Sequence, residues 1–191
     1  MARRGVASAL GDLHIESIRQ LHKSDLRWAD AFLASNLGGR MQARRGELID
    51  VLEGDGLVGE LAGHAVALIA WLSEPGGPSA EIRAVAVDHD ARGRGIGRAL
   101  FEAAHDVLAD SGTRTVWLVT TNDNEPAIRL YQSLGYGVVE IRHGAIDEIR
   151  RTLKPSIPLL GHNGIEMHDE IELRRSIPRR CAYQLAPGGG P

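Results

Sequence analysis

The chain has 191 residues and a mass of 20.6 kDa, near the size of one domain, and 43% of its residues are hydrophobic, which suffices for a sizeable core. A formal net charge of -3, from 22 Lys and Arg against 25 Asp and Glu, disfavours nucleic acids and anionic membranes as partners. The longest apolar run, residues 65–72, is too short to span a bilayer, and the apolar residues 6–10 are fewer than a signal peptide needs, so a cytoplasmic protein is expected.

The sequence predicts one domain between two tails. The first dozen residues lack hydrophobic periodicity, and the last five are only Pro and Gly. No repeat and no long linker divides the rest of the chain. We therefore expect a flexible tail at 1–11, a single domain at 12–176 and a second tail at 177–191.

Hydrophobic periodicity and turn residues predict alternating strands and helices. In the first half these are a strand within 13–21, a helix from a cap at Ser24 or Asp25 to Gly38, an antiparallel strand pair within 46–73 and a strand at 81–88. In the second half these are a helix from Ile96 to Gly112, a strand at 115–121, a helix with Pro126 in its first turn, a strand at 136–141, a helix at 145–153, a tight turn at Asn163-Gly164 and a strand at 169–175. Such alternation indicates an α/β (α+β) fold around a mixed sheet.

The loop RGRGIG, residues 92–97, lies between a predicted strand and a predicted helix. Its three glycines allow the backbone to approach a ligand closely, and the helix adds free amides and a favourable dipole at its N-terminus. Its spacing excludes the dinucleotide-binding and P-loop motifs. The loop therefore predicts a site for another phosphate-bearing ligand, with an ordinary glycine-rich turn as the alternative.

Two segments resemble signatures of the Gcn5-related N-acetyltransferases (GNAT). RGRGIG fits the [RQ]xxGx[GA] loop of that family, and NEPAIRLYQSLGY, residues 124–136, is similar to its second signature segment. The resemblance extends from about Glu81 to Tyr136. It implies a largely antiparallel central sheet flanked by helices, acetyl-coenzyme A (acetyl-CoA) as acetyl donor and a primary amine as acceptor.

The resemblance also assigns donor-binding residues. It implies that the loop amides hold the pyrophosphate, that the preceding strand offers backbone hydrogen bonds to the pantetheine arm, and that the second segment contacts the arm and the sulfur. By position these residues are Arg92, Gly93, Arg94, Gly95, Ile96, Gly97 and Arg98 in the loop, Val85, Ala86 and Val87 in the strand, and Asn124, Ala127 and Tyr131 in the second segment.

Two residues are candidate catalytic groups by the same resemblance. Glu81 stands eleven residues before Arg92, where histone-type members of the family place a general base that deprotonates the amine directly or through water. The alternative for Glu81 is an ion pair, with Arg83 as a partner. Tyr131 is the candidate acid for the departing thiolate, and its alternative is apolar packing. A backbone amide near residues 85–87, freed by a strand bulge, would stabilise the oxyanion.

Other features bear on metals and partners. The eight His residues lack metal-site spacing and Cys181 is the only cysteine, so no metal site and no intrachain disulfide are expected. Residues 142–168, inserted between the last two predicted strands, are expected to shape the acceptor site or a homodimer contact. We expect a small-molecule amine or a peptide N-terminus as acceptor. The alternatives are a non-catalytic acetyl-CoA sensor or scaffold, and a loop that binds another phosphorylated metabolite.

Overall fold

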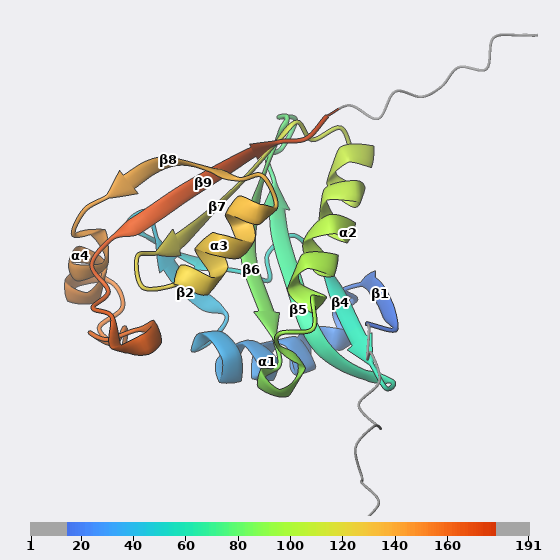
Figure 1. Ribbon diagram of the computed structural model, residues 1–191, viewed down its shortest axis with the longest axis horizontal. Coiled ribbons are helices and arrows are strands. Elements are labelled where there is room, and N and C mark those ends of the chain that lie inside the picture. Colours follow the sequence, from blue (N-terminus) through green and yellow to red (C-terminus); the bar gives the residue numbers. More distant parts are fainter. Residues whose placement is uncertain (1–14, 179–191) are drawn as a thin grey trace, which may run out of the picture.

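A computed structural model describes residues 15–178 of the chain (Figure 1). The predicted tail at 1–11, most of the predicted tail at 177–191 and Cys181 lie outside the described residues. The strands are β1 (Ser17–Gln20), β2 (Met41–Arg44), β3 (Glu47–Asp50), β4 (Asp55–Leu61), β5 (His64–Ser73), β6 (Ser79–Val87), β7 (Thr115–Thr121), β8 (Gly137–Arg142) and β9 (Glu170–Ser176). The α-helices are α1 (Leu26–Leu37), α2 (Ile96–Asp110), α3 (Glu125–Ser133) and α4 (Ala145–Thr152), and three short 3-10 helices span Lys23–Asp25, His89–Ala91 and His162–Gly164.

A seven-stranded sheet in the order β1-β4-β5-β6-β7-β9-β8 forms the centre of the molecule, and β2 and β3 form a separate hairpin. Only β6 and β7 pair in parallel, so the sheet is mixed and largely antiparallel, as predicted. In Figure 1, α2 and α3 lie on one side of the sheet, and α1 lies below its central strands. No helix within residues 15–178 has the length and apolar character needed to cross a bilayer.

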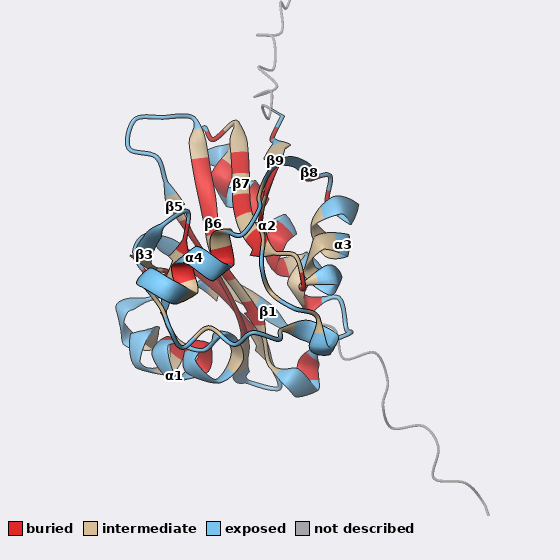
Figure 2. Ribbon diagram, turned by 90° about the vertical axis from the view of Figure 1, so that its left-hand side faces the viewer, coloured by how far each residue is buried: buried red, intermediate tan, exposed pale blue. Residues whose placement is uncertain are grey.

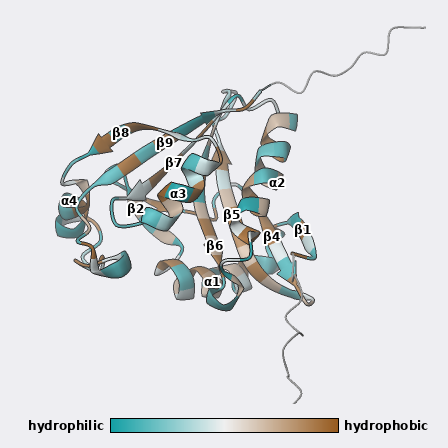
Figure 3. Cartoon of the chain, in the orientation of Figure 1, coloured by the Kyte–Doolittle hydropathy of each residue, from teal (hydrophilic) through white to brown (hydrophobic). Residues whose placement is uncertain are grey.

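Alternating side chains of the central strands fill two hydrophobic clusters. Ile69 on β5 packs in one cluster with Leu100 and Phe101 of α2, and its neighbour Leu68 packs in the other cluster with Leu33 of α1. Successive residues of a strand point to opposite faces of the sheet, so α2 covers one face and α1 covers the other. Figure 2 shows the buried segments along β6 and β7, and Figure 3 shows hydrophobic residues along β5 and β6 in contrast to the hydrophilic α4.

The hairpin of β2 and β3 is the main element that the sequence did not predict. Its turn places Arg45 at φ 52° and Gly46 at φ 78°, although Arg rarely adopts a positive φ. The amide of Arg45 donates to both carboxylate oxygens of Glu170, at 3.0 and 3.1 Å. A contact with a residue far along the chain thus supports this turn, and local sequence carries no signal for it.

The predicted tight turn at Asn163-Gly164 is a 3-10 turn with positive φ at both residues. On either side of this turn, Leu160 and Glu166 form one isolated antiparallel bridge, so the flanking segments do not form two regular strands. The strap between β8 and β9, residues 143–169, therefore consists of α4 and an irregular segment.

Strands β6 and β7 pair only at their beginnings, from Ser79 with Thr115 to Ile82 with Leu118. The register between β5 and β6 shifts at the next residue, Arg83, which forms a bulge. Beyond this bulge β6 still pairs with β5, whereas β7 pairs with β9 along its whole length. Residues 83–87 therefore have one unpaired backbone edge.

Candidate active site

The open edge of β6 presents the backbone groups of alternate residues. The amide of Asp88 donates to the carbonyl of Val66 on β5 at 2.8 Å, and hydrogen-bonded pairs alternate along an antiparallel ladder. By this alternation Ala86 is directed toward β5, and Val85 and Val87 direct their backbone groups to the open edge. At the open edge, the Val87 carbonyl accepts a hydrogen bond from Arg92 Nε at 2.9 Å. The other backbone groups that face this edge are the amides of Val85 and Val87 and the carbonyl of Val85.

The glycine-rich loop has a conformation that exposes its amides. Gly93 has φ 76° and Gly95 has φ 77°, which glycine adopts without steric cost. The first intrahelical hydrogen bond of α2 runs from the amide of Ala99 to the carbonyl of Gly95. Within the described chain, no carbonyl or side chain accepts a hydrogen bond from the amides of residues 93–98. These amides and the N-terminus of α2 suit an anionic ligand such as a pyrophosphate.

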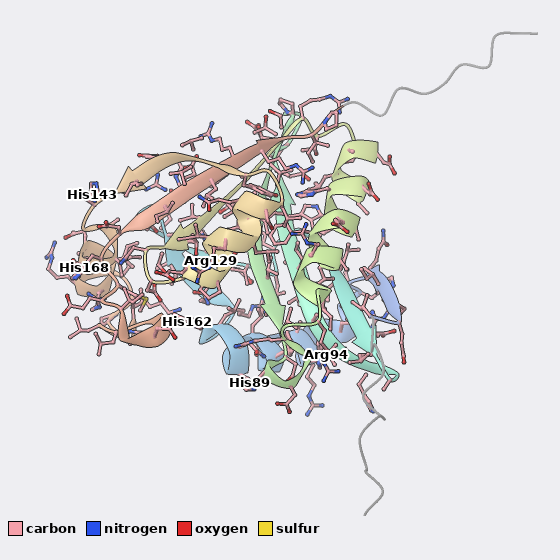
Figure 4. The ribbon with its side chains drawn as sticks, in the orientation of Figure 1. His89, Arg94, Arg129, His143, His162 and His168 are labelled. Carbon is pink, nitrogen blue, oxygen red and sulfur yellow. The ribbon has the colours of Figure 1, made fainter. Side chains whose placement is uncertain are left out.

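The three arginines of the loop have different surroundings. Arg92 is held by its bond to β6 and by Asn36 Oδ1 at 3.0 Å, and Arg98 Nη2 donates to Ser133 Oγ at 2.6 Å. Arg94 is exposed, and Figure 4 shows it at the loop beside the start of α2. Arg92 and Arg98 thus secure the loop to neighbouring elements, whereas Arg94 points its charge into solvent.

A cavity of about 590 Å³ lies between the loop, the open edge of β6 and α3. Of the predicted donor-binding residues, all but Arg94 line it, namely Val85, Ala86, Val87, Arg92, Gly93, Gly95, Ile96, Gly97, Arg98, Asn124, Ala127 and Tyr131. The structure therefore brings together two segments that are separated by about 26 residues in the sequence. We call this space the donor cavity.

A second cavity of about 550 Å³ adjoins the donor cavity, and we call it the acceptor cavity. Residues of β2, β6, β7 and the strap line it, including Arg44, Arg83, Thr120, Lys154 and Met167. Both cavities share the residues Asn36, Leu37, Val85, Asp123, Asn124 and Tyr131. A ligand in one cavity can thus reach a ligand in the other past these side chains.

Tyr131 lies where the two cavities meet. Its ring packs edge-on against Phe101, with 5.5 Å between ring centroids, and burial raises the pKa of its hydroxyl to about 12. In the described part of the chain, no group hydrogen bonds to this hydroxyl. The packing expected as the alternative for Tyr131 is therefore present, and its hydroxyl is neutral at pH 7, while its role as a proton donor stays a prediction.

The aromatic cluster behind Tyr131 contains a buried histidine. Arg175 Nη1 donates to His105 Nδ1 at 3.1 Å, so Nδ1 is the unprotonated nitrogen and Nε2 donates to the Tyr136 hydroxyl at 2.7 Å. Burial and the nearby charge of Arg175 lower the pKa of His105 to about 4. The network fixes α2 against the end of α3 and β9, and so supports Phe101 beneath Tyr131.

A pH dependence of stability follows from His105. Because its pKa in the folded protein is lower than the ordinary 6.5, the unfolded chain binds the extra proton first, and stability falls as the pH decreases from about 6.5 to about 4. The contribution of this residue is roughly 3 kcal/mol. Urea unfolding at pH 7 and pH 4 should show a smaller loss for His105→Gln than for the wild type. An equal loss in both proteins would contradict the shifted pKa.

Glu81 does not line either cavity. Its Oε1 accepts from Arg44 Nη1 at 3.0 Å and its Oε2 accepts from Arg83 Nε at 3.1 Å, and all three side chains are about nine-tenths buried. The expected ion pair with Arg83 is present, together with a second one that involves the unpredicted hairpin. Glu81 therefore reaches the acceptor cavity only through a water or through its two arginine partners.

Asp123 is a carboxylate of the site that the sequence did not single out. It is buried and lines both cavities, and its oxygens accept from Thr121 Oγ1 and, at 2.8 Å, from the amide of His162. A Cβ added at Gly161 would overlap Asp123 Oδ2, so a side chain at this position would displace the carboxylate. In the sequence, the place of Asp123 directly before Asn124 was a weak signal for a site residue, because Asp is common in turns.

The acidic and histidine side chains near the site pair with one another. Among residues 15–178, no group of three or more His, Cys, Asp or Glu side chains is arranged to hold a metal ion. His143 and His168, labelled in Figure 4, instead pair with Asp169 and Asp147 on the strap, at 3.0 and 2.8 Å.

Comparisons with known proteins agree with this geometry. The model of the acetyltransferase (GNAT) family matches residues 15–136. The uncharacterized protein YxbD of Bacillus subtilis is 33% identical over 128 residues, which cover 67% of this chain and 77% of that protein. The [ribosomal protein bS18]-alanine N-acetyltransferase of Escherichia coli is 45% identical over 58 residues, only 30% of this chain and 39% of that enzyme.

Solved structures show the same fold. A Bacillus subtilis acetyltransferase in complex with CoA superposes with a TM-score of 0.67 at 18% identity, over 84% of this chain and 98% of that one. The match of the family model over residues 15–136 confirms the expected family. The family match over residues 15–136 agrees with the glycine loop before α2 and with the separation of β6 from β7 beyond Ile82 and Leu118. The chain therefore belongs to the GNAT acetyltransferase family and is an acyltransferase.

Proposed function

We propose that this acyltransferase transfers the acetyl group of acetyl-CoA to a primary amine by direct attack, with a small molecule or a peptide N-terminus as acceptor. The observation that carries the proposal is the meeting of the two cavities at Tyr131 and the open edge of β6. The CoA complex of a protein with the same fold supports the choice of donor. We further propose that residues 12–176 are one catalytic domain with an insertion at 142–168.

The donor cavity has groups that suit the pyrophosphate and the pantetheine arm of CoA. The amides of residues 93–98 would hold the pyrophosphate, and the amide of Val87 would bind the pantetheine arm as an added strand does. Asn124 and Ala127 would line the arm, and Ala86 would contribute packing because its backbone groups face β5. Acetyl-CoA supplies the reactive thioester.

The chain's own groups would assist the reaction at the amine nitrogen, at the carbonyl oxygen and at the sulfur of the thioester. A primary amine with a pKa of about 10 is mostly protonated at pH 7, so its proton must leave before its lone pair can attack the carbonyl carbon. The outward amide of Val85, next to the bulge, would donate to the carbonyl oxygen as charge develops there. Tyr131 would donate its proton to the thiolate as the bond from carbon to sulfur breaks.

Glu81 is the proposed acceptor of the amine proton, through water, since its two oxygens already accept from Arg44 and Arg83. In Glu81→Gln, the rate should fall at neutral pH and recover in part at higher pH, where more amine is already deprotonated. The dissociation constant of CoA should barely change. Rate measurements over pH with one amine substrate, together with CoA titrations, check this expectation.

Glu53→Gln is the matched control, because Glu53 also accepts from Arg83, at 3.1 Å, but is exposed and lies away from both cavities. Its rate profile should follow the wild type. A defect of Glu81→Gln that stays the same at every pH would instead assign Glu81 to the placement of Arg44 and Arg83.

A screen of amines tests the proposed function. Purified protein with acetyl-CoA and a panel of amines and short peptides should release free CoA thiol, and mass spectrometry should find one acetyl group added to the amine. If CoA binds in calorimetry and no amine or peptide is acetylated, the proposal is wrong and a sensor or scaffold is favoured. Absence of CoA binding would favour another phosphorylated ligand.

A further inference from the structure

The acceptor cavity contains cations and anions that are mostly matched to one another. Arg44 and Arg83 share the carboxylate of Glu81, and Arg83 also contacts Glu53. The anion Glu170 accepts from Arg142 Nε at 3.3 Å and from the backbone of the β2–β3 turn. These groups have ionic partners within residues 15–178. The carboxylate of Asp123 also lines the cavity, and it accepts hydrogen bonds from Thr121 Oγ1 and the amide of His162.

Lys154 is the exception among the cations that line the cavity. Its Nζ donates to the carbonyl of Met41 at 2.7 Å, which leaves two of its three N–H groups for other acceptors. No carboxylate of residues 15–178 lies within 4.0 Å of this ammonium group. Lys154 is half-buried, and burial lowers its pKa. An ammonium group in this position has lost part of its hydration without gaining a counter-ion.

The strap holds Lys154 in a defined place. Just before it in the chain, Arg150 donates to the carbonyls of Ile157, Pro158 and Met167, at 3.0, 3.0 and 2.9 Å. These bonds tie the end of α4 to the segment that follows. The bond from Lys154 to the carbonyl of Met41 then joins the strap to β2, and it restricts the positions that the ammonium group can take.

We propose that Lys154 binds a carboxylate of the acceptor, so that the acceptor is an amine that also carries a carboxylate. The inference rests on the proposed acetyl transfer. It agrees with the chemistry, because the reactive form of such a molecule has a neutral amine and a negative carboxylate, and is therefore a net anion. A cation in the cavity favours this form over the protonated amine.

Matched pairs of acceptors test the inference. Linear amines of increasing length, each ending in a carboxylate or in the corresponding carboxamide, differ in charge while their amines remain alike. For the best length, kcat/KM of the wild type should be about tenfold or more higher with the carboxylate, the effect of one charge-assisted hydrogen bond. Lys154→Met should remove this preference, and Lys154→Arg should keep part of it.

Lys23→Met is the control, because Lys23 is the other lysine of the chain and is exposed on the 3-10 helix before α1. It should retain the preference. If Lys154→Met lowers kcat/KM equally for carboxylates and carboxamides, Lys154 only tethers the strap and the inference is wrong. A wild type that prefers carboxamides, or shows no preference, also overturns it.

Binding measurements separate this inference from the proposed function. Calorimetry with CoA-saturated protein should show that the best amino carboxylate binds to the wild type and about tenfold more weakly to Lys154→Met. If this binding occurs without acetylation, the inference stands and the proposed transfer fails. If carboxamides are acetylated as well as carboxylates, the transfer stands and the inference fails. If neither binding nor acetylation of amino carboxylates occurs, the inference is wrong.

Discussion

Replacement of Tyr131 by Phe is expected to lower turnover by about tenfold or more when departure of the thiolate limits the rate, since a general acid typically contributes about 10²–10⁴-fold. The change keeps the ring and its edge-on contact with Phe101 and removes only the proton donor. Because burial raises the pKa of Tyr131 to about 12, the wild type keeps this proton throughout the range in which amines deprotonate. Raising the pH should therefore not rescue the variant.

The matched control for this change is Tyr136→Phe. Tyr136 is buried, lines neither cavity and bonds to His105 at 2.7 Å, so its variant should lose about 1–3 kcal/mol of stability and keep its turnover. Steady-state rates of both variants, with thermal unfolding as a check, make the comparison. Unchanged turnover in Tyr131→Phe would refute the assignment of this hydroxyl as the acid.

Replacement of Gly95 by Val is expected to raise the dissociation constant of CoA far more than Arg94→Ala does. A valine at φ 77° is strained, and relaxation of the loop would turn the amides of residues 93–98 away from a common ligand. Gly97→Val should also raise this constant, because Gly97 lines the donor cavity and the methyl groups of a valine there would occupy part of it. Arg94 is exposed and lines no cavity.

Gly63→Val is the control that distinguishes the effect of backbone strain on CoA binding from the loss of the loop amides. Gly63 has φ 71° in the turn between β4 and β5 and has open space around its Cβ position, so it carries the same backbone penalty away from the cavities. Calorimetric titration with CoA should give a nearly unchanged dissociation constant for this variant and a strongly raised one for Gly95→Val. An effect of Gly95→Val no larger than that of Arg94→Ala would contradict the role of the loop.

The sequence allowed prediction of the elements whose signals are local. Periodicity predicted α2, whose buried residues Ile96, Leu100 and Ala104 recur every four residues, and β7 was predicted at its observed bounds. The hairpin of β2 and β3 was missed because its strands have four residues each and Glu170, far along the chain, supports its turn. The donor-binding residues could be predicted because they lie in two contiguous segments of the sequence.

The residues of the acceptor cavity could not be predicted from the sequence in this way. Arg44, Arg83, Asp123 and Lys154 come from four separate segments of the chain, and only the fold brings them to one cavity. Nothing near Lys154 in the sequence distinguishes it from a solvated surface lysine. Its bond to β2 and the lack of a carboxylate near it among residues 15–178 are properties of the tertiary structure, and they carry the proposal that it binds a carboxylate of the acceptor.

Binding of the donor between the diverging ends of β6 and β7 is the premise for the roles of Tyr131 and Lys154. Amide chemical shifts of the labelled protein during titration with CoA test it most directly. Shifts should concentrate in the amides of residues 93–98, Val85 and Val87, and remain small for Ala86, whose amide faces β5. Binding of CoA that leaves these amides unchanged and shifts others would contradict the assigned donor site.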